Sequence, residues 1–171
     1  VCETITGDGE IWVNEEGKLK CSGKKPSPSY KFVDGKWVED KKLHTIFIKE
    51  QLTSAKQSKN NDLISKSQEF IDNITESNKT PDFEIRTWHQ QAIEAKEWFI
   101  DKTVETPLLK NIAINRGINI DELRMKAYKK AIQYEHIVST IVGRRQKYEK
   151  LIESANSIDE IDSIVITFNL E

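Results

Sequence analysis

The stretch Thr106-Pro-Leu-Leu-Lys-Asn-Ile-Ala-Ile-Asn-Arg-Gly-Ile-Asn-Ile-Asp-Glu122 contains the signals that decide the fold. Thr106 followed by Pro107 is typical of a helix start, because proline suits the first helical position. Gly117 is typical of a helix end, since glycine adopts the left-handed backbone without strain. Asn119 and Glu122 then predict the start of a longer helix. The stretch therefore predicts two successive helices.

Similar capping signals lie on both sides of this stretch. Thr87 and Gln90 form a capping-box pattern ahead of an apolar helix that carries two tryptophans. Ser157 and Glu160 predict a last short helix, and a terminal extended segment follows it. We therefore expect residues 80–171 to form a helical domain.

Gly143 is the unusual residue of the long helix in this domain. Glycine inside a helix costs about 1 kcal/mol relative to alanine. The close approach of a neighbouring helix would offset that cost, so Gly143 is a candidate helix-crossing point.

Residues 41–79 contain no glycine or proline, and Asp40 can cap a helix that starts there. Apolar residues recur at roughly helical intervals, but the centre, Lys56 to Asp62, is wholly polar. The pattern predicts either one long helix with a weak centre or two helices that break near Asn60. A narrow apolar stripe on a polar helix also favours packing against a sister chain or another helix.

Residues 1–40 have the pattern of a small β-hairpin module. Asp34-Gly35 is a two-residue turn between β-forming residues, which is the strongest short hairpin signal. In that hairpin Phe32 and Trp37 would be neighbours across the strands. The preceding stretch from Glu10 to Lys20 predicts two further short strands. The fold class expected is therefore mainly α: a small N-terminal β-hairpin module, a long middle helix and a C-terminal helical bundle.

Composition bounds the class of protein. The 171 residues carry a formal net charge of -2, with 32% charged residues, which does not suggest a basic groove for nucleic acid. A mean hydropathy of -0.61 and the lack of a long apolar run argue against a membrane-spanning helix. The two cysteines, Cys2 and Cys21, could form a disulfide, but free thiols are favoured.

No catalytic motif is found in the sequence. The three histidines, at 44, 89 and 136, do not form a spaced metal-binding pair, and no nucleophile elbow or phosphate-binding loop is present. We therefore expect no catalytic residues, no metal and no cofactor. A cell-wall hydrolase is the enzymatic alternative, and it would need acidic residues or histidines clustered in a cleft.

Aromatic and apolar residues of the hairpins and the middle helix are the candidates for binding another protein. Exposed aromatic side chains near an edge strand are good anchors for protein contacts. The predicted protein-binding residues are Trp12, Phe32, Trp37, Phe47, Leu52, Leu63 and Phe70.

Several motifs resemble a helical domain found in tail proteins of tailed phages and prophages. In chain order they are Trp88-His-Gln-Gln-Ala-Ile-Glu-Ala-Lys-Glu-Trp98, Thr106-Pro-Leu-Leu109, Ile114-Asn-Arg-Gly-Ile118 and Gly143-Arg-Arg-Gln146. The resemblance covers about residues 81–164. Separately, the hairpin around Asp34-Gly35 looks like a small Trp-containing hairpin common in tail-fibre proteins and tail-fibre assembly chaperones.

The resemblance implies a phage-tail context and no enzyme. The leading hypothesis is a tail-fibre-associated protein that binds a fibre subunit during assembly, in the bacterial host cytoplasm or on the virion tail. The alternative is a structural end segment of the fibre itself, which trimerises through the middle helix. Neither hypothesis calls for nucleic acid or a membrane as a partner.

Overall fold

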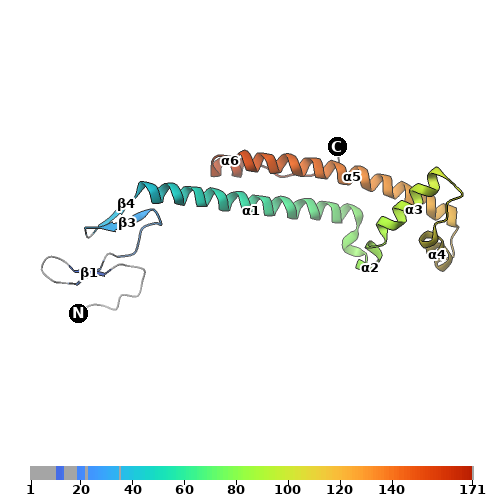
Figure 1. Cartoon of the computed structure of the whole chain (residues 1–171), viewed down its shortest axis with the longest axis horizontal. Coiled ribbons are helices and arrows are strands. Elements are labelled where there is room, and N and C mark those ends of the chain that lie inside the picture. Colours follow the sequence, from blue (N-terminus) through green and yellow to red (C-terminus); the bar gives the residue numbers. More distant parts are fainter. Residues whose placement is uncertain (1–10, 14–18, 22, 35, 171) are drawn as a thin grey trace. The chain divides into compact units, whose positions relative to one another are not determined.

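The computed structural model describes residues 11–13, 19–21, 23–34 and 36–170 of the 171-residue chain. It is mainly α-helical, as the sequence predicts, with short hairpins near the N-terminus (Figure 1). Backbone contacts divide the chain into two compact units. The first unit contains residues 1–59 and 155–163, and the second contains residues 60–154 and 164–171.

The first unit contains two hairpins, the start of a long helix and a short helix. Its elements are β1 (Ile11–Val13), β2 (Leu19–Cys21), β3 (Tyr30–Val33), β4 (Lys36–Glu39), the first part of α1 (Lys41–Thr75) and α6 (Ile158–Ser163). β1 pairs with β2 and β3 pairs with β4, both antiparallel. The turn predicted between β1 and β2 lies outside the described residues, as do Cys2 and the side chain of Cys21.

The β3–β4 hairpin has the predicted register. Phe32 lies opposite Trp37, and their rings make an edge-to-face contact with centroids 5.2 Å apart. Asp34 adopts a positive φ of 47°, which a two-residue hairpin turn requires. The turn chemistry of Asp34 and the aromatic pair therefore fix this register together.

α1 is one continuous helix of 35 residues, so the polar centre does not break it (Figure 1). The predicted cap is confirmed, because the Asp40 carboxylate accepts hydrogen bonds from the backbone N–H groups of Lys42 and Leu43 at 2.9 and 3.0 Å. Only Leu63 and Ser67 of this helix are buried, and both belong to the second unit. The structure therefore divides α1 at residue 59, whereas the sequence pattern set residues 41–79 apart as a single region.

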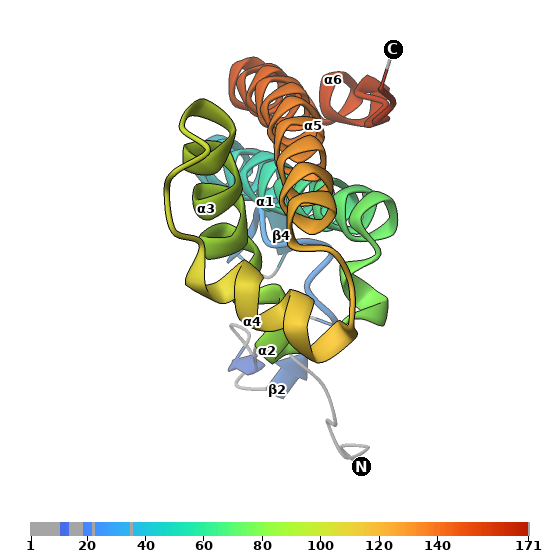
Figure 2. The same cartoon turned by 90° about the vertical axis from the view of Figure 1, so that its right-hand side faces the viewer.

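The second unit contains the rest of α1 and most of the other helices. These are the 3-10 helix η1 (Ser77–Lys79), α2 (Asp82–Ile85), α3 (Trp88–Ile100), α4 (Pro107–Arg116) and α5 (Ile120–Ser154). α3, α4 and α5 pack together around Ala95, Leu109, Ala113 and Leu123 (Figure 2). A second apolar cluster contains Leu63, Ile152 and Ile166, which come from α1, α5 and the C-terminal segment.

Most of the predicted helix boundaries are confirmed. Gly117 has a φ of 63°, and Ile118 N–H donates to the Ala113 carbonyl to close the end of α4. The Asn119 side chain accepts from the N–H groups of Asp121 and Glu122 and so caps α5. Ser157 caps α6 in the same way, through the Glu160 N–H at 3.2 Å.

The predicted capping box at Thr87 and Gln90 is wrong. Thr87 has a helical backbone, and its hydroxyl donates to the Glu84 carbonyl at 2.7 Å. The same hydroxyl accepts from the Gln91 side chain at 2.8 Å. The short helix α2 precedes Thr87 and supplies the carbonyl, so this hydroxyl does not cap α3.

The predicted helix crossing at Gly143 is also wrong. A Cβ placed on Gly143 would meet no atom within 4 Å, and the residue is exposed. Within the described chain nothing approaches this glycine closely, and we have no packing reason for its presence in α5.

Candidate protein-binding surface

The β3–β4 hairpin is joined to the start of α1 through Asp40. The Asp40 N–H donates to the Ser29 carbonyl at 2.8 Å, and the Asp40 carboxylate pairs with the Lys31 ammonium at 2.6 Å. Glu39 pairs with the neighbouring His44 at 2.9 Å. One carboxylate therefore caps the helix and holds a strand lysine, which fixes the hairpin against the helix end.

The charge state of Asp40 follows from these contacts. The Lys31 ammonium, together with the backbone N–H of Leu43, holds the pKa of Asp40 below its ordinary value of 3.8. The carboxylate is therefore ionised near neutral pH, which suits a cap at the positive end of a helix.

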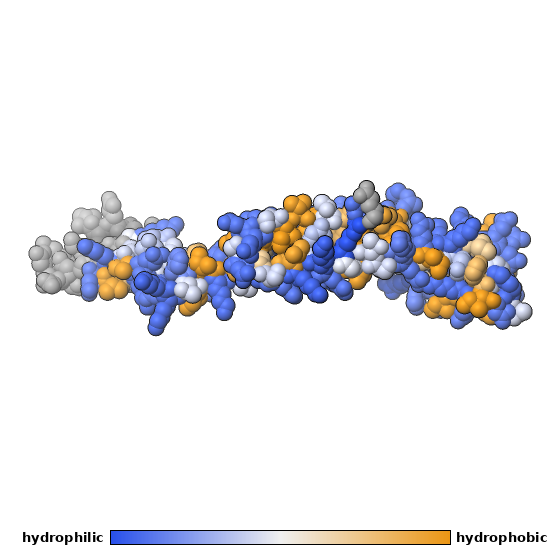
Figure 3. Space-filling view, turned by 90° about the horizontal axis from the view of Figure 1, so that it is seen from above, coloured by the Kyte–Doolittle hydropathy of each residue, from blue (hydrophilic) through white to orange (hydrophobic). Residues whose placement is uncertain are grey.

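We define the hairpin–helix surface as residues 23–34 and 36–59. Its helical part contains no buried residue, although it carries apolar side chains throughout. Ile46 and Ile48 are 52% and 48% exposed, and Val33 and Val38 of the hairpin are 48% and 51% exposed. Hydrophobic side chains also lie in separate groups among hydrophilic ones on the face drawn in Figure 3.

The hairpin–helix surface is also basic. It carries nine lysines against four acidic residues, whereas the whole chain has a net charge of -2. No arginine precedes Arg86 in the sequence, so all of this positive charge is on lysine. The surface therefore combines exposed aliphatic groups with flexible point charges, which is suited to an acidic partner.

The predicted binding residues fall into three groups. Phe32, Trp37, Phe47 and Leu52 are half-buried parts of the hairpin–helix surface. Leu63 and Phe70 belong to the second unit, where Leu63 is only 1% exposed and Phe70 lies beside Phe168. Trp12 lies in β1, and its side chain is outside the described part. The described candidates therefore belong to two separate units of the chain.

The sequence reasoning missed Glu94, a carboxylate that is only 4% exposed. Its two oxygens accept hydrogen bonds from the N–H groups of Leu108 and Leu109, at 3.1 and 3.0 Å, and so cap α4 from a different helix. Thr106, at the predicted start of this helix, makes no side-chain cap, and its hydroxyl instead accepts from Arg124 at 2.7 Å. Both carboxylate oxygens are therefore engaged in holding α4 to α3.

The motifs that resemble tail proteins supply the residues that join α3, α4 and α5, and we call this contact region the helix junction. The Lys102 ammonium lies 3.5 Å from the centroid of the Trp98 ring, and the Arg124 guanidinium lies 5.4 Å from it. Glu94 and Thr106 lie in the same motifs and make the contacts described above. The motif residues therefore hold α3, α4 and α5 together, which is a structural role.

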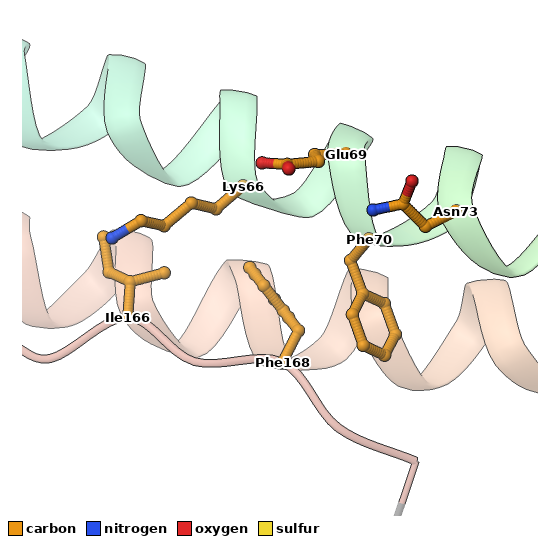
Figure 4. Close-up of a pocket in the computed structure, with 6 residues that line it drawn as sticks. All are labelled: Lys66, Glu69, Phe70, Asn73, Ile166 and Phe168. Carbon is orange, nitrogen blue, oxygen red and sulfur yellow. The ribbon is translucent and has the colours of Figure 1, made fainter. Parts of the chain in front are cut away.

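A shallow pocket of about 190 Å³ lies beside the C-terminal segment. Lys66, Glu69, Phe70 and Asn73 of α1 line it together with Ile166 and Phe168 (Figure 4). Figure 4 shows the Phe70 side chain extending from α1 towards the segment that carries Phe168. Lys66 and Glu69 are the titratable side chains of this lining, and the other four lining residues are apolar or an amide.

Across residues 11–13, 19–21, 23–34 and 36–170, no group of three or more histidine, cysteine or acidic side chains is arranged to hold a metal ion. In the same part of the chain, no helix has the length and apolarity needed to cross a membrane. His89 and His136 are exposed on α3 and α5.

Comparison with protein-family models, with curated proteins and with solved structures finds no match to this chain.

Proposed function

We propose that this chain is a non-enzymatic, tail-fibre-associated protein of a phage or prophage, which binds a fibre subunit as an assembly chaperone. It acts in the bacterial host cytoplasm during assembly or stays on the virion tail. The motifs between Trp88 and Gln146 support the tail context, and the hairpin–helix surface supports the binding role.

The observation that carries the binding role is the first part of α1. A helix is marginal in water unless it packs an apolar face. Residues 41–59 nevertheless leave Ile46 and Ile48 about half exposed, and they bury Phe47 and Leu52 only in part. A partner that covers these side chains would remove the apolar surface from water and stabilise the helix.

The positive charge of the hairpin–helix surface favours a protein partner that presents an acidic surface. An excess of five positive charges speeds the encounter with such a face. The electrostatic attraction between the two surfaces weakens as salt is added. Lysine-only charge is less suited to phosphate, which is bound in bidentate fashion by arginine. The aliphatic groups between the lysines then supply contact area.

The test is co-purification of the full chain with the fibre subunit encoded next to it. We expect a stable complex whose affinity falls as salt is raised from low to physiological concentration. Recovery of the chain without the fibre subunit, at micromolar concentrations of both, would overturn the proposal.

Charge-reversal variants locate the contact. Lys41→Glu with Lys49→Glu changes two exposed lysines of α1, and we expect at least tenfold weaker binding of the fibre subunit. Lys110→Glu with Lys129→Glu makes the same charge change on exposed positions of α4 and α5 and serves as the matched control. Equal loss in both variants would place the contact outside the hairpin–helix surface.

A second candidate function is a structural, trimerising end of the fibre. The continuity of α1 through its polar centre favours this candidate, because a 35-residue helix offers a long surface for packing between chains. The mass of the full chain in solution separates the two functions. A stable trimer supports the structural role, and a monomer or dimer supports the chaperone.

A further inference from the structure

The C-terminal segment, residues 164–170, is extended and presents two different sides. Ile164, Ile166 and Phe168 pack against the cluster around Leu63, with Ile166 only 6% exposed. Val165 lies between them in sequence and is 72% exposed. The segment therefore alternates inward and outward side chains, as a β-strand does.

A groove in the second unit receives the inward side chains. Leu63 and Phe70 of α1 and Tyr148 and Ile152 of α5 form its sides. The Phe168 ring lies 6.0 Å from the rings of both Phe70 and Tyr148, measured between centroids. Figure 4 shows the segment passing below α1, with Ile166 and Phe168 rising from it.

Side chains, rather than strand pairing, hold the segment in this groove. The Tyr148 hydroxyl donates to the Thr167 carbonyl and accepts from the Thr167 N–H, both at 3.2 Å. Arg144 donates to the carbonyl and side-chain oxygens of Asn169. No described strand pairs with residues 164–170. The groove therefore accommodates an apolar side chain at every second position of an extended segment.

We infer that this groove is a binding site for an extended segment, and that it also accepts the C-terminal segment of a second copy of the chain. The segment of a second copy carries the same three side chains, so every contact described here is available to it. Exchange of the segments between two copies replaces each contact within a chain by the same contact between chains. This inference does not depend on the fibre partner.

A synthetic peptide of residues 164–171 probes the groove of the full-length chain. Ile166→Asp prevents the chain's own segment from occupying the groove, because a carboxylate cannot enter an apolar cluster unpaired. We expect this variant to bind the peptide at least tenfold more tightly than the unchanged chain, in which the attached segment competes. The fluorescence anisotropy of a dye-labelled peptide measures the binding.

A peptide with Ile166 and Thr167 exchanged is the matched control, because it has the same composition but a broken alternation. We expect it to bind at least tenfold more weakly than the natural peptide. Equal binding of the two peptides, or no binding of either to a folded Ile166→Asp chain, overturns the inference. Circular dichroism establishes the folding, and Phe168→Ala replaces Ile166→Asp if that variant loses its helix content.

Two complementary variants test exchange between copies. The Ile166→Asp chain has an intact groove, and a Tyr148→Ala chain has an intact segment but a damaged groove. We expect each alone to be monomeric and their mixture to form a one-to-one dimer, seen by sedimentation. Absence of that dimer at concentrations where the peptide binds overturns the second copy as occupant and leaves the groove to a segment of another protein.

Discussion

The helix junction of α3, α4 and α5 and the hairpin–helix surface treat polar groups in opposite ways. In the junction, Glu94 and Thr106 are buried and bonded to groups on other helices. In the hairpin–helix surface, the pairs made by Lys31 and His44 are partly exposed and lie close together in sequence. The difference teaches that buried polar contacts of the helix junction specify the fold, whereas the hairpin–helix surface leaves exposed the side chains that we propose contact a partner. Substitutions should therefore affect stability in one region and binding in the other.

Truncating one buried and one exposed aliphatic residue of α1 should give the largest contrast. Leu63→Ala removes a side chain that is 1% exposed, and we expect a loss of about 3 kcal/mol in the free energy of unfolding. Ile46→Ala changes a residue that is 52% exposed, and we expect a loss below about 0.5 kcal/mol. Denaturant unfolding followed by circular dichroism measures both values.

In a binding assay, the order of the two effects should reverse, with Ile46→Ala having the larger effect. Ile46→Ala should weaken the complex with the fibre subunit, because the partner covers this side chain in the proposed complex. Comparable loss of stability in the two variants would show that Ile46 is needed for the fold, and the contrast between the regions would then fail.

Removing the buried charge of Glu94 should have the next largest effect. Glu94→Gln leaves one acceptor for the two N–H groups of Leu108 and Leu109, and we expect a loss of about 2 kcal/mol in unfolding free energy. Glu97→Gln is the matched control on the exposed side of α3, and we expect little change there. A similar effect of both substitutions would mean that helix charge, rather than the remote cap, stabilises the junction.

Local signals explain why most helix boundaries are predictable from the sequence. Gly117, Asn119 and Asp40 act on backbone groups within a few residues, so their roles follow from position alone. The hairpin register follows in the same way from Asp34 and the Phe32–Trp37 pair.

Interactions over long sequence distances explain what the sequence did not reveal. Glu94 caps a helix that begins 13 residues later, and no spacing rule connects the two positions. The burial of Leu63 depends on the C-terminal segment about 100 residues away. The split of the predicted binding stripe between Phe47 and Leu63 could therefore emerge only from the fold.

Gly143→Ala should raise stability by a smaller amount. The Cβ would enter open space, so alanine gains its helical preference without a clash, and we expect about 1 kcal/mol of added unfolding free energy. Thermal unfolding would report a higher midpoint. A lower midpoint would indicate that a partner or second copy approaches α5 closely at this glycine in solution.

The smallest expected effect is a pH dependence of the contact between the hairpin and α1. The pKa of Asp40 in the folded chain lies below 3.8, so the ionised carboxylate stabilises the contact between the hairpin and α1 above that pH. This stabilisation should be lost as the pH falls through the lowered pKa, and the NMR signal of the Trp37 indole N–H should shift below pH 3.8. Asp40→Asn keeps a good helix cap but loses the Lys31 pair, so it should abolish this transition while α1 remains helical. Because Glu39 faces His44 beside this site, Glu39→Gln is the control, and a transition that vanishes in that variant instead would assign the pH dependence to the Glu39–His44 pair.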